Sequence, residues 1–335
     1  MSSSIFRRGL LAAILASATP LFASLPASAA EKVVFLISWL PGGDESIPYV
    51  GVSKGLFAAE GLDVTVQVGR GATEVVTKLA TGAADIGEGG LAGLLQAKAR
   101  GDVPVKALLS VFSKQPDAIF TTEGSGIRSL KDLTGRKVAT ATFTSSNVFW
   151  PLVLKNNDVD VSKVDLLKVD PGVLAPMLAT GKVDATINWT TVGPLFEKAL
   201  ADSGRKLVVI PWSGFGFDGY GLSVFASEKM LKERPEVVRK FLRAYLKAAE
   251  MAVSDPKIAA ASLKAIVPEV DLDVATKQFA ATVPLTVNEI SKKNGLGTFD
   301  KALLAKTWEW TAKSQNIPLD KLDPESVVDR SFAPM

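Results

Sequence analysis

The stretch LATGAAD (79–85) returns almost unchanged as LATGKVD (178–184). Each copy closes a segment with helical spacing and precedes a short apolar run. We therefore expect a helix end, a glycine that stops the helix, and a strand associated with the aspartate. Many α/β proteins end their helices in this way, so the repeat alone does not prove a duplication. Because both copies hold the same place in a strand–helix–strand unit, they favour two similarly built lobes.

Strands and helices alternate on both sides of the repeats. VVFLIS (33–38) is a continuous apolar run, typical of a strand buried on both faces, and LDVTVQV (62–68) alternates like a strand. Helical patterns prevail after Ser227. The alternation predicts an α/β protein with two mainly parallel sheets. Further strands are expected over 85–87, 137–141, 164–169 and 184–187.

Residues 1–29 have the features of a cleaved secretory signal peptide. Arg7 and Arg8 precede a mostly apolar run (10–25), and Ala-Ser-Ala (27–29) supplies the small residues that a signal peptidase requires. The alternative, a membrane-anchoring helix, is disfavoured by the short length and by two prolines. The paired arginines leave the general secretory and twin-arginine routes both open. We expect an exported, periplasmic protein.

The composition excludes several classes of function. Removal of residues 1–29, which hold two arginines and no acidic residue, lowers the formal net charge from +3 to +1, so nothing in the bulk charge favours nucleic acid. The chain has no cysteine and no histidine, so it forms no disulfide, no Ser-His-Asp or Cys-His arrangement and no common zinc site. A metal held by carboxylates alone stays formally open. We expect no enzyme activity, no cofactor and no metal.

Five stretches resemble, in the same order, the periplasmic substrate-binding proteins of ABC importers, in the nitrate/sulfonate/taurine and thiamine-pyrimidine group. The resemblance spans nearly all of the chain after residue 30, and it says more about fold and role than about the ligand. The stretches are YVGVSKGLFAAEGLDVTV (49–66), GATEVVTKLATGAADIG (71–87), SLKDLTGRKVAT (129–140), LATGKVDATI (178–187) and RPEVVRKFLRAYLKA (234–248).

The resemblance implies a type II periplasmic-binding fold, in which two α/β lobes close on a ligand in the cleft between them. The first lobe would comprise 30–115 and 222–335, and the second 116–221. Two strands would cross between the lobes near 113–118 and 217–223. The resemblance also implies that the closed form meets a membrane permease with a cytoplasmic ATPase. We expect a monomer.

In the first lobe, candidate ligand contacts follow predicted strands, because open α/β sheets bind ligands at the carboxyl ends of their strands. Trp39 offers a flat wall to a ring or an alkyl chain. Asp44 and Glu88 offer carboxylates to an ammonium group or a ring N–H. The alternatives are that Trp39 belongs to the core and that Glu88 pairs with a basic residue.

A glycine-rich turn precedes the helix that ends in the first repeat. Gly71 and Thr73 place backbone N–H groups at a helix N-terminus, where anions are favoured. Arg70 is a candidate to clamp a carboxylate or a sulfonate, unless it lies on the surface. The Gly-Lys-Ser/Thr ending of a phosphate-binding P-loop is missing.

In the second lobe, two polar segments are expected to face the cleft. Thr144, Ser145 and Asn147 sit where the next helix begins, and they either contact the ligand or cap the helix. Asn188 and Trp189 follow the strand of the second repeat. Near the return crossing, a glycine-rich segment (214–220) carries two further candidates, Asp218 and Tyr220.

The candidate residues point to two different classes of ligand. Two helix N-termini and Arg70 favour an organic anion such as a sulfonate or a carboxylate. Asp44, Glu88 and Asp218, together with two tryptophans, favour a pyrimidine or another nitrogen-bearing aromatic solute, or a zwitterion such as taurine. An inorganic ion as small as nitrate would leave the aromatic walls uncovered. We prefer a small organic solute, with the sulfonate-like anion first.

Two other roles stay open. The chain could report a bound ligand to a membrane receptor, since a sensor needs the same fold. Thiamine-pyrimidine synthases also resemble this chain, but they depend on histidine and on cysteine-containing motifs, and this chain contains neither residue.

Overall fold

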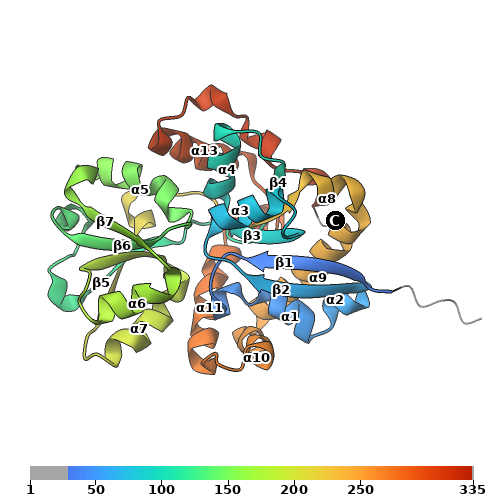
Figure 1. Ribbon diagram of the computed structural model, residues 1–335, viewed down its shortest axis with the longest axis horizontal. Helices are drawn as coiled ribbons and strands as arrows, with labels where there is room; N and C mark the ends of the chain where they lie inside the picture. Colours follow the sequence, from blue (N-terminus) through green and yellow to red (C-terminus); the bar gives the residue numbers. More distant parts are fainter. Residues whose placement is uncertain (1–28, 334–335) are drawn as a thin grey trace, which may run out of the picture.

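Two five-stranded sheets form the centres of two lobes, shown in Figure 1 by a computed structural model that describes residues 29–333. The predicted signal peptide lies outside the described residues. The first lobe is built on β1 (Glu31–Ile37), β2 (Leu62–Val68), β3 (Ile86–Gly90), β4 (Val105–Ser110) and β10 (Leu222–Ser227). The second lobe is built on β5 (Asp117–Thr122), β6 (Lys137–Ala141), β7 (Asp165–Val169), β8 (Ala185–Trp189) and β9 (Leu207–Pro211).

The two sheets share one topology. The first has the strand order β2-β1-β3-β10-β4 and the second β7-β6-β8-β5-β9. In each sheet three strands are parallel, and the strand that arrives from the other lobe (β10 or β5) pairs antiparallel on both sides. The two-lobed α/β prediction is confirmed, but the sheets are mixed, because the chain reverses direction where it crosses between lobes.

The two sequence repeats form the same structure. Gly82 and Gly181 have φ angles of +76° and +72°, the left-handed conformation that glycine adopts readily at a helix end. The aspartate of each copy then joins its own strand to the next. Asp85 accepts a hydrogen bond from Val34 N on β1 (2.8 Å), and Asp184 accepts one from Lys137 N on β6 (2.8 Å). The repeat therefore fixes the same strand pairing in both lobes.

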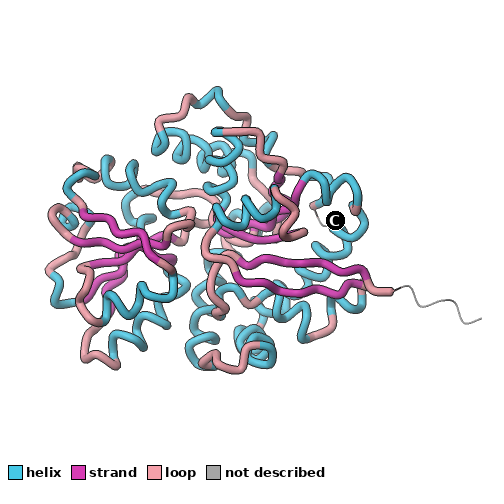
Figure 2. Tube along the Cα trace, in the orientation of Figure 1, coloured by secondary structure: helices cyan, strands magenta, loops and turns pink. Residues whose placement is uncertain are grey.

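Helices cover both faces of each sheet, as Figure 2 shows. On α9, apolar residues at helical spacing, among them Phe241 and Tyr245, are buried against the ring of Phe35 on β1. None of the described helices is long and apolar enough to cross a membrane. The first lobe carries α1 (Ile47–Ser53), α2 (Leu56–Ala59), α3 (Ala72–Ala80), α4 (Leu91–Arg100), α8 (Glu228–Glu233), α9 (Pro235–Ser254), α10 (Pro256–Ile266), α11 (Leu272–Thr286), α12 (Glu289–Asn294) and α13 (Lys301–Gln315), and the second α5 (Ser146–Lys155), α6 (Leu174–Ala179) and α7 (Gly193–Ala201).

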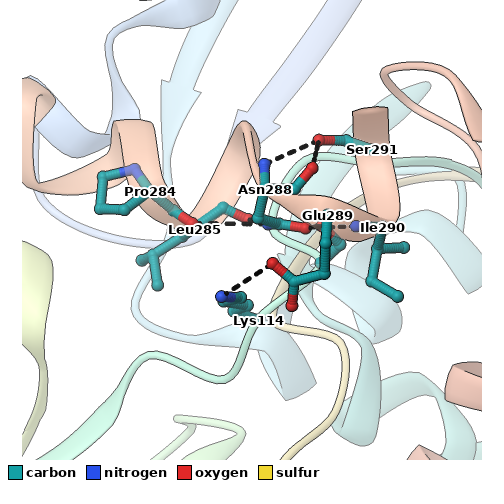
Figure 3. Close-up of polar contacts among 8 residues, drawn as sticks. Lys114, Pro284, Leu285, Asn288, Glu289, Ile290 and Ser291 are labelled. Atoms are coloured by element: carbon teal, nitrogen blue, oxygen red, sulfur yellow. Dashed lines mark hydrogen bonds and ion pairs between the residues drawn. The ribbon is translucent and has the colours of Figure 1, made fainter. Parts of the chain in front are cut away.

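The segment that leads from β4 to β5 is held by the turn between α11 and α12. The side-chain amide of Asn288 donates to Ser113 Oγ (2.9 Å), and Ser113 N donates to Leu285 O (3.0 Å). Figure 3 shows Asn288 at the start of α12, and Lys114 paired with Glu289 beside it (3.2 Å). The amide of Asn288 is buried, so one end of this interlobe connection is fixed to the first lobe.

Two C-terminal helices also contact the second lobe. On α13, Ser314 Oγ accepts from Leu152 N (3.2 Å), and Gln315 donates to Val148 O on α5 (2.6 Å). At the start of α11, Asp271 forms an ion pair with Lys198 on α7. Figure 1 shows both helices along the border between the lobes. The relative position of the two lobes is therefore set by more than the two crossing segments.

Candidate functional site

A pocket lies between the lobes where the parallel strands of both sheets end. Its volume is about 410 Å³, including its open mouth. The loops after β1 and β2, the end of β3, the loop after β6 and the end of β8 all contribute, as expected for open α/β sheets. The lining residues are Ser38, Trp39, Asp44, Glu45, Gly71, Ala72, Gly90, Thr144, Ser145, Ile187, Asn188, Trp189 and Val192.

The lobes touch around this pocket, in two places through glycine. Gly71 has φ +142°, and a Cβ atom there would lie 2.2 Å from the carbonyl of Phe143 in the other lobe. Next to it, Thr73 N and Oγ1 donate to Phe143 O (3.2 and 3.0 Å). A Cβ atom on Gly90 would lie 2.1 Å from Ser145 Oγ. The close approach of the two backbones therefore depends on the missing side chains.

The wall formed by the first lobe is acidic. Asp44 and Glu45 come from a 3-10 turn (Gly43–Glu45), which α11 holds through a hydrogen bond from Gly43 N to Gln278 Oε1 (3.0 Å). Glu88, on β3, lies behind them. These three carboxyl groups are 4 %, 2 % and 0 % exposed. Buried carboxylates need partners, so their hydrogen bonds determine what the wall can bind.

Each of the three carboxyl groups has a partner. Thr191 Oγ1 in the second lobe donates to Asp44 Oδ2 (2.7 Å), which adds a hydrogen bond between the lobes. Ser38 donates to Glu45 from its hydroxyl (3.1 Å) and its backbone N–H (3.3 Å). The phenol of Tyr245 donates to Glu88 Oε2. One oxygen of Asp44 and one of Glu88 have no partner among the described residues.

Burial raises the pKa of all three acids. The pKa of Asp44 rises to about 6, although the hydrogen bond from Thr191 opposes the change. The pKa of Glu88 rises to about 7, with Tyr245 opposing. Burial also raises the pKa of Glu45 well above its usual value, and the negative charges of Glu88 and Asp44 add to this effect. The first-lobe wall therefore holds protons at a pH where ordinary carboxyl groups have lost them.

The wall formed by the second lobe carries no charge. It presents the hydroxyls of Thr144 and Ser145, the amide of Asn188 and the indole of Trp189. Asn188 donates to Thr186 Oγ1 (2.7 Å), and its carbonyl oxygen has no partner among the described residues. The indole N–H of Trp189 is directed at the buried Asp117. This wall therefore offers one free acceptor beside an aromatic ring.

The buried acid of the second lobe differs from those of the first. Asp117 at the start of β5 accepts from Ser146 on one oxygen and from Gln115 on the other. Burial raises its pKa to about 6, and these hydrogen bonds oppose the rise. Asp117 does not line the pocket. It fixes the start of α5 and leaves no acceptor free.

The pocket has no basic residue among the described residues that line it. The same part of the chain holds no cluster of acidic side chains arranged to bind a metal ion. What the site offers is a set of acceptors, led by the unpartnered oxygen of Asp44, between tryptophan rings and small apolar groups. Such a site matches N–H donors on a flat solute better than it matches an anion.

The structure brings seven of the residues predicted from the sequence to the pocket. Three others support it: Glu88 stands behind Asp44 and Glu45, Thr73 joins the lobes, and Asn147 donates to Ala141 O (2.8 Å), which holds the loop after β6. The seven that line the pocket are Trp39, Asp44, Gly71, Thr144, Ser145, Asn188 and Trp189.

Three predicted residues lie away from the pocket. Arg70 is exposed and pairs with Glu74 on the next turn (3.6 Å). Asp218 pairs with Lys306 on α13 (3.4 Å). Tyr220 is buried in the core of the first lobe, where its hydroxyl accepts from Asp300 N (2.5 Å). The cationic clamp on which the preference for an anion partly depended is therefore not in the pocket.

Other residues of the site were missed. Glu45 follows Asp44 in the same loop, and this adjacency was the one local signal for it. Gly90 lies just after the strand expected over 85–87, but its contact with Ser145 depends on how the lobes meet. Tyr245 lies in the middle of a long helix, and nothing near it in the sequence indicates a carboxylate partner.

Comparison with known proteins places this site in context. Residues 45–259 match the family model described as "NMT1/THI5 like". The riboflavin-binding protein RibY of Chloroflexus aurantiacus is 25 % identical over 314 residues, which cover 91 % of this chain and 86 % of that protein. A 4-amino-5-hydroxymethyl-2-methylpyrimidine phosphate synthase of Saccharomyces cerevisiae, THI13, is 26 % identical over 265 residues, covering 74 % of this chain and 75 % of the yeast protein.

Solved structures share the fold at lower identity. The alkanesulfonate-binding protein SsuA of Xanthomonas axonopodis pv. citri, bound to MOPS, superposes with a TM-score of 0.70 at 17 % identity, covering 90 % of this chain and all of that one. SsuA of Escherichia coli superposes with a TM-score of 0.64 at 17 % identity, covering 89 % and 97 %. These similarities establish the two-lobed periplasmic-binding-protein fold.

Proposed function

The chain belongs to the NMT1/THI5-like family, and from this premise we propose that it is an exported solute-binding protein for a nitrogen-bearing heteroaromatic solute. The solute lies between the lobes, with N–H groups directed at Asp44 and Glu45 and a ring beside Trp39 and Trp189. A membrane permease of an ABC importer, with its ATPase, receives the solute from the closed form.

The observation that carries the proposal is the unpartnered, buried carboxylate oxygen of Asp44 in a pocket without a basic lining residue among those described. A buried acceptor without a donor costs roughly 1–3 kcal/mol, and a ligand N–H recovers that cost. An anion would instead place its charge against an acidic wall. The pocket therefore supports the nitrogen-bearing alternative over the sulfonate-like anion, which was the first choice from the sequence.

The names of the relatives agree with a nitrogen-bearing solute. RibY is named for riboflavin and the yeast protein for a pyrimidine phosphate, and both compounds contain nitrogen heterocycles. The SsuA proteins are named for sulfonates, but at 17 % identity they support the fold alone. Binding without catalysis is proposed because the chain has neither the histidine nor the cysteine of the synthases it resembles.

Calorimetry and thermal unfolding test the ligand class directly. The probes are 4-amino-2-methylpyrimidine, riboflavin, taurine and an alkanesulfonate. At least one nitrogen heterocycle should raise the melting temperature, and Asp44→Asn should weaken its binding about ten- to hundredfold, because a charged hydrogen bond is lost. The control Asp63→Asn changes an exposed acid on β2 of the same lobe and should leave binding unchanged.

Two results would count against the proposal. A rise in melting temperature with the sulfonates and none with the heterocycles would favour an anion as the solute. An equal loss of affinity in Asp44→Asn and Asp63→Asn would mean that Asp44 acts through the negative charge of the lobe as a whole and not through a contact with the solute.

A further inference from the structure

A second hollow adjoins the pocket and opens outward between the lobes. We call it the outer chamber, and its volume is about 1190 Å³ including open solvent. Four residues line both spaces, so the two adjoin each other there: Trp39, Asp44, Asn188 and Val192. The outer chamber therefore begins beside these residues of the inner pocket.

The walls of the outer chamber are mostly apolar and come from both lobes. The first lobe contributes the loop after β1, with Leu40 and Pro41, and the segment before α11, with Val267 and Val270. The second lobe contributes Pro171 and the α7 side chains Leu195 and Phe196. Leu195 is 42 % exposed, so part of its side chain stays open to the chamber and to solvent.

Charged groups stand at the outer rim of this chamber. Lys198 on α7 and Asp271 at the start of α11 pair with each other across the two lobes, and Glu269 lies close by in the same lining. The chamber thus runs from the acidic inner pocket, through an apolar middle, to a charged exit. This order matches a solute with a polar head and an apolar extension.

Building on the proposed function, we propose that the outer chamber is a second subsite, which holds an aromatic or alkyl extension of the solute whose nitrogen-bearing head lies at Asp44 and Glu45. The four shared lining residues bring the two spaces side by side, which is the arrangement that one molecule with two parts requires. The solute is consequently elongated, and its length is read by Leu195, Val270 and the loop after β1.

A chain-length series tests the proposal. The probes are 4-amino-2-methylpyrimidine and its derivatives with a propyl or a hexyl chain at ring carbon 5, measured by calorimetry against the full mature protein. Affinity should rise with chain length by up to about fourfold for each methylene that becomes fully buried. The variant Leu195→Glu should bind all three probes with nearly equal affinity, because a charge now stands in the apolar wall.

The control is Leu319→Glu, which changes an apolar side chain that is 51 % exposed and does not line the chamber. It should keep the rise of affinity with chain length. Equal affinities of the three probes for the unaltered protein would overturn the second subsite and leave the proposed function standing. A protein that binds the hexyl probe and not the head would also overturn it, since the two parts would then be unrelated. No binding of any probe, together with binding of sulfonates, would overturn the proposed function, and the subsite with it.

Discussion

The two lobes have the same strand order and the same repeated turn, yet they present different chemistry to the cleft. The first lobe offers Asp44 and Glu45, backed by Glu88, and two of these acids have an oxygen with no partner among the described residues. The second lobe offers hydroxyls, an amide and an indole, and both oxygens of its buried Asp117 already accept hydrogen bonds. A shared topology therefore determines where the two walls stand and leaves their chemistry free to differ.

Because their walls differ in chemistry, the two lobes have different roles in binding. An acidic wall holds a solute by its N–H groups, while a neutral wall can close over it without adding charge to the cleft. Thr191 connects the two, because its hydroxyl in the second lobe donates to Asp44 in the first. Closure thus adds one hydrogen bond to the acidic wall and leaves the second oxygen of Asp44 without a protein partner among the described residues.

The largest expected effect concerns stability against pH. The folded protein holds a proton on Glu88 up to about pH 7, whereas an unfolded glutamate releases it near its usual pKa of 4.5. Between these values, rising pH favours the unfolded state, so the free energy of unfolding falls by on the order of 3 kcal/mol. Below pH 4.5 this loss is absent, and above pH 7 it is complete. Glu88→Gln should flatten the profile, as measured by urea unfolding from pH 4.5 to 7.5.

The control for this experiment is Glu233→Gln, an exposed glutamate of the same lobe, which should keep the slope. Asp117→Asn should change the lower part of the profile, because the pKa of Asp117 rises to about 6. A slope that is the same in Glu88→Gln and in the unaltered protein would show that Glu88 does not hold a proton in this pH range.

The next effect concerns closure. Gly90→Ala places a Cβ atom within 2.1 Å of Ser145 Oγ, at a backbone φ of −64° that alanine adopts without strain. The clash exists only when the lobes meet, so affinity should fall about ten- to hundredfold while the melting temperature without ligand stays nearly constant. Calorimetry and small-angle scattering with ligand would measure both consequences.

The double variant Gly90→Ala/Ser145→Gly tests the cause of this loss. Removing the serine side chain should restore most of the affinity, because the added methyl group then has room. A loss that persists in the double variant would mean that Gly90 acts within its own lobe and not across the cleft.

The smallest effect concerns the ion pair at the rim. Lys198→Met removes the ion pair with Asp271 that joins the two lobes. The hydrogen bond from Lys198 is the chief reason why the pKa of the Asp271 carboxylate is lowered to about 2. Exposed pairs are weak and are screened by salt, so affinity should fall less than about fivefold at low ionic strength and stay unchanged at high ionic strength. Lys277→Met breaks an exposed pair within α11 and should have no effect. Equal losses of affinity in Lys198→Met and Lys277→Met would show that the ion pair between Lys198 and Asp271 does not stabilise the closed form.

The sequence predicted the fold because the signals for it are local. Apolar runs such as 33–38, alternation over 62–68 and glycine after each repeat all depend on neighbours within a few residues. The same logic placed the site at strand ends, and Trp39 and Asn188 lie there. The exact boundaries of the lobes and the ligand contacts stay predictions.

What the sequence could not predict depends on partners that are distant in the chain. Tyr245 meets Glu88 over 157 residues, and Thr191 meets Asp44 over 147. Arg70 shows the opposite case, because Glu74 stands four residues later and an ion pair on one helix turn could have been anticipated. The surface position that the sequence left open for Arg70 is the one that the structure shows.

The contact between Gly71 and Phe143 has a consequence for how such a protein changes over evolutionary time. Main chain meets main chain there, so at this point the approach of the lobes does not depend on which side chains line the cleft. Mutations can exchange the lining for a different solute while the lobes still stop at the same separation. The thickness of an acceptable solute is then inherited, and only its chemistry is open to selection.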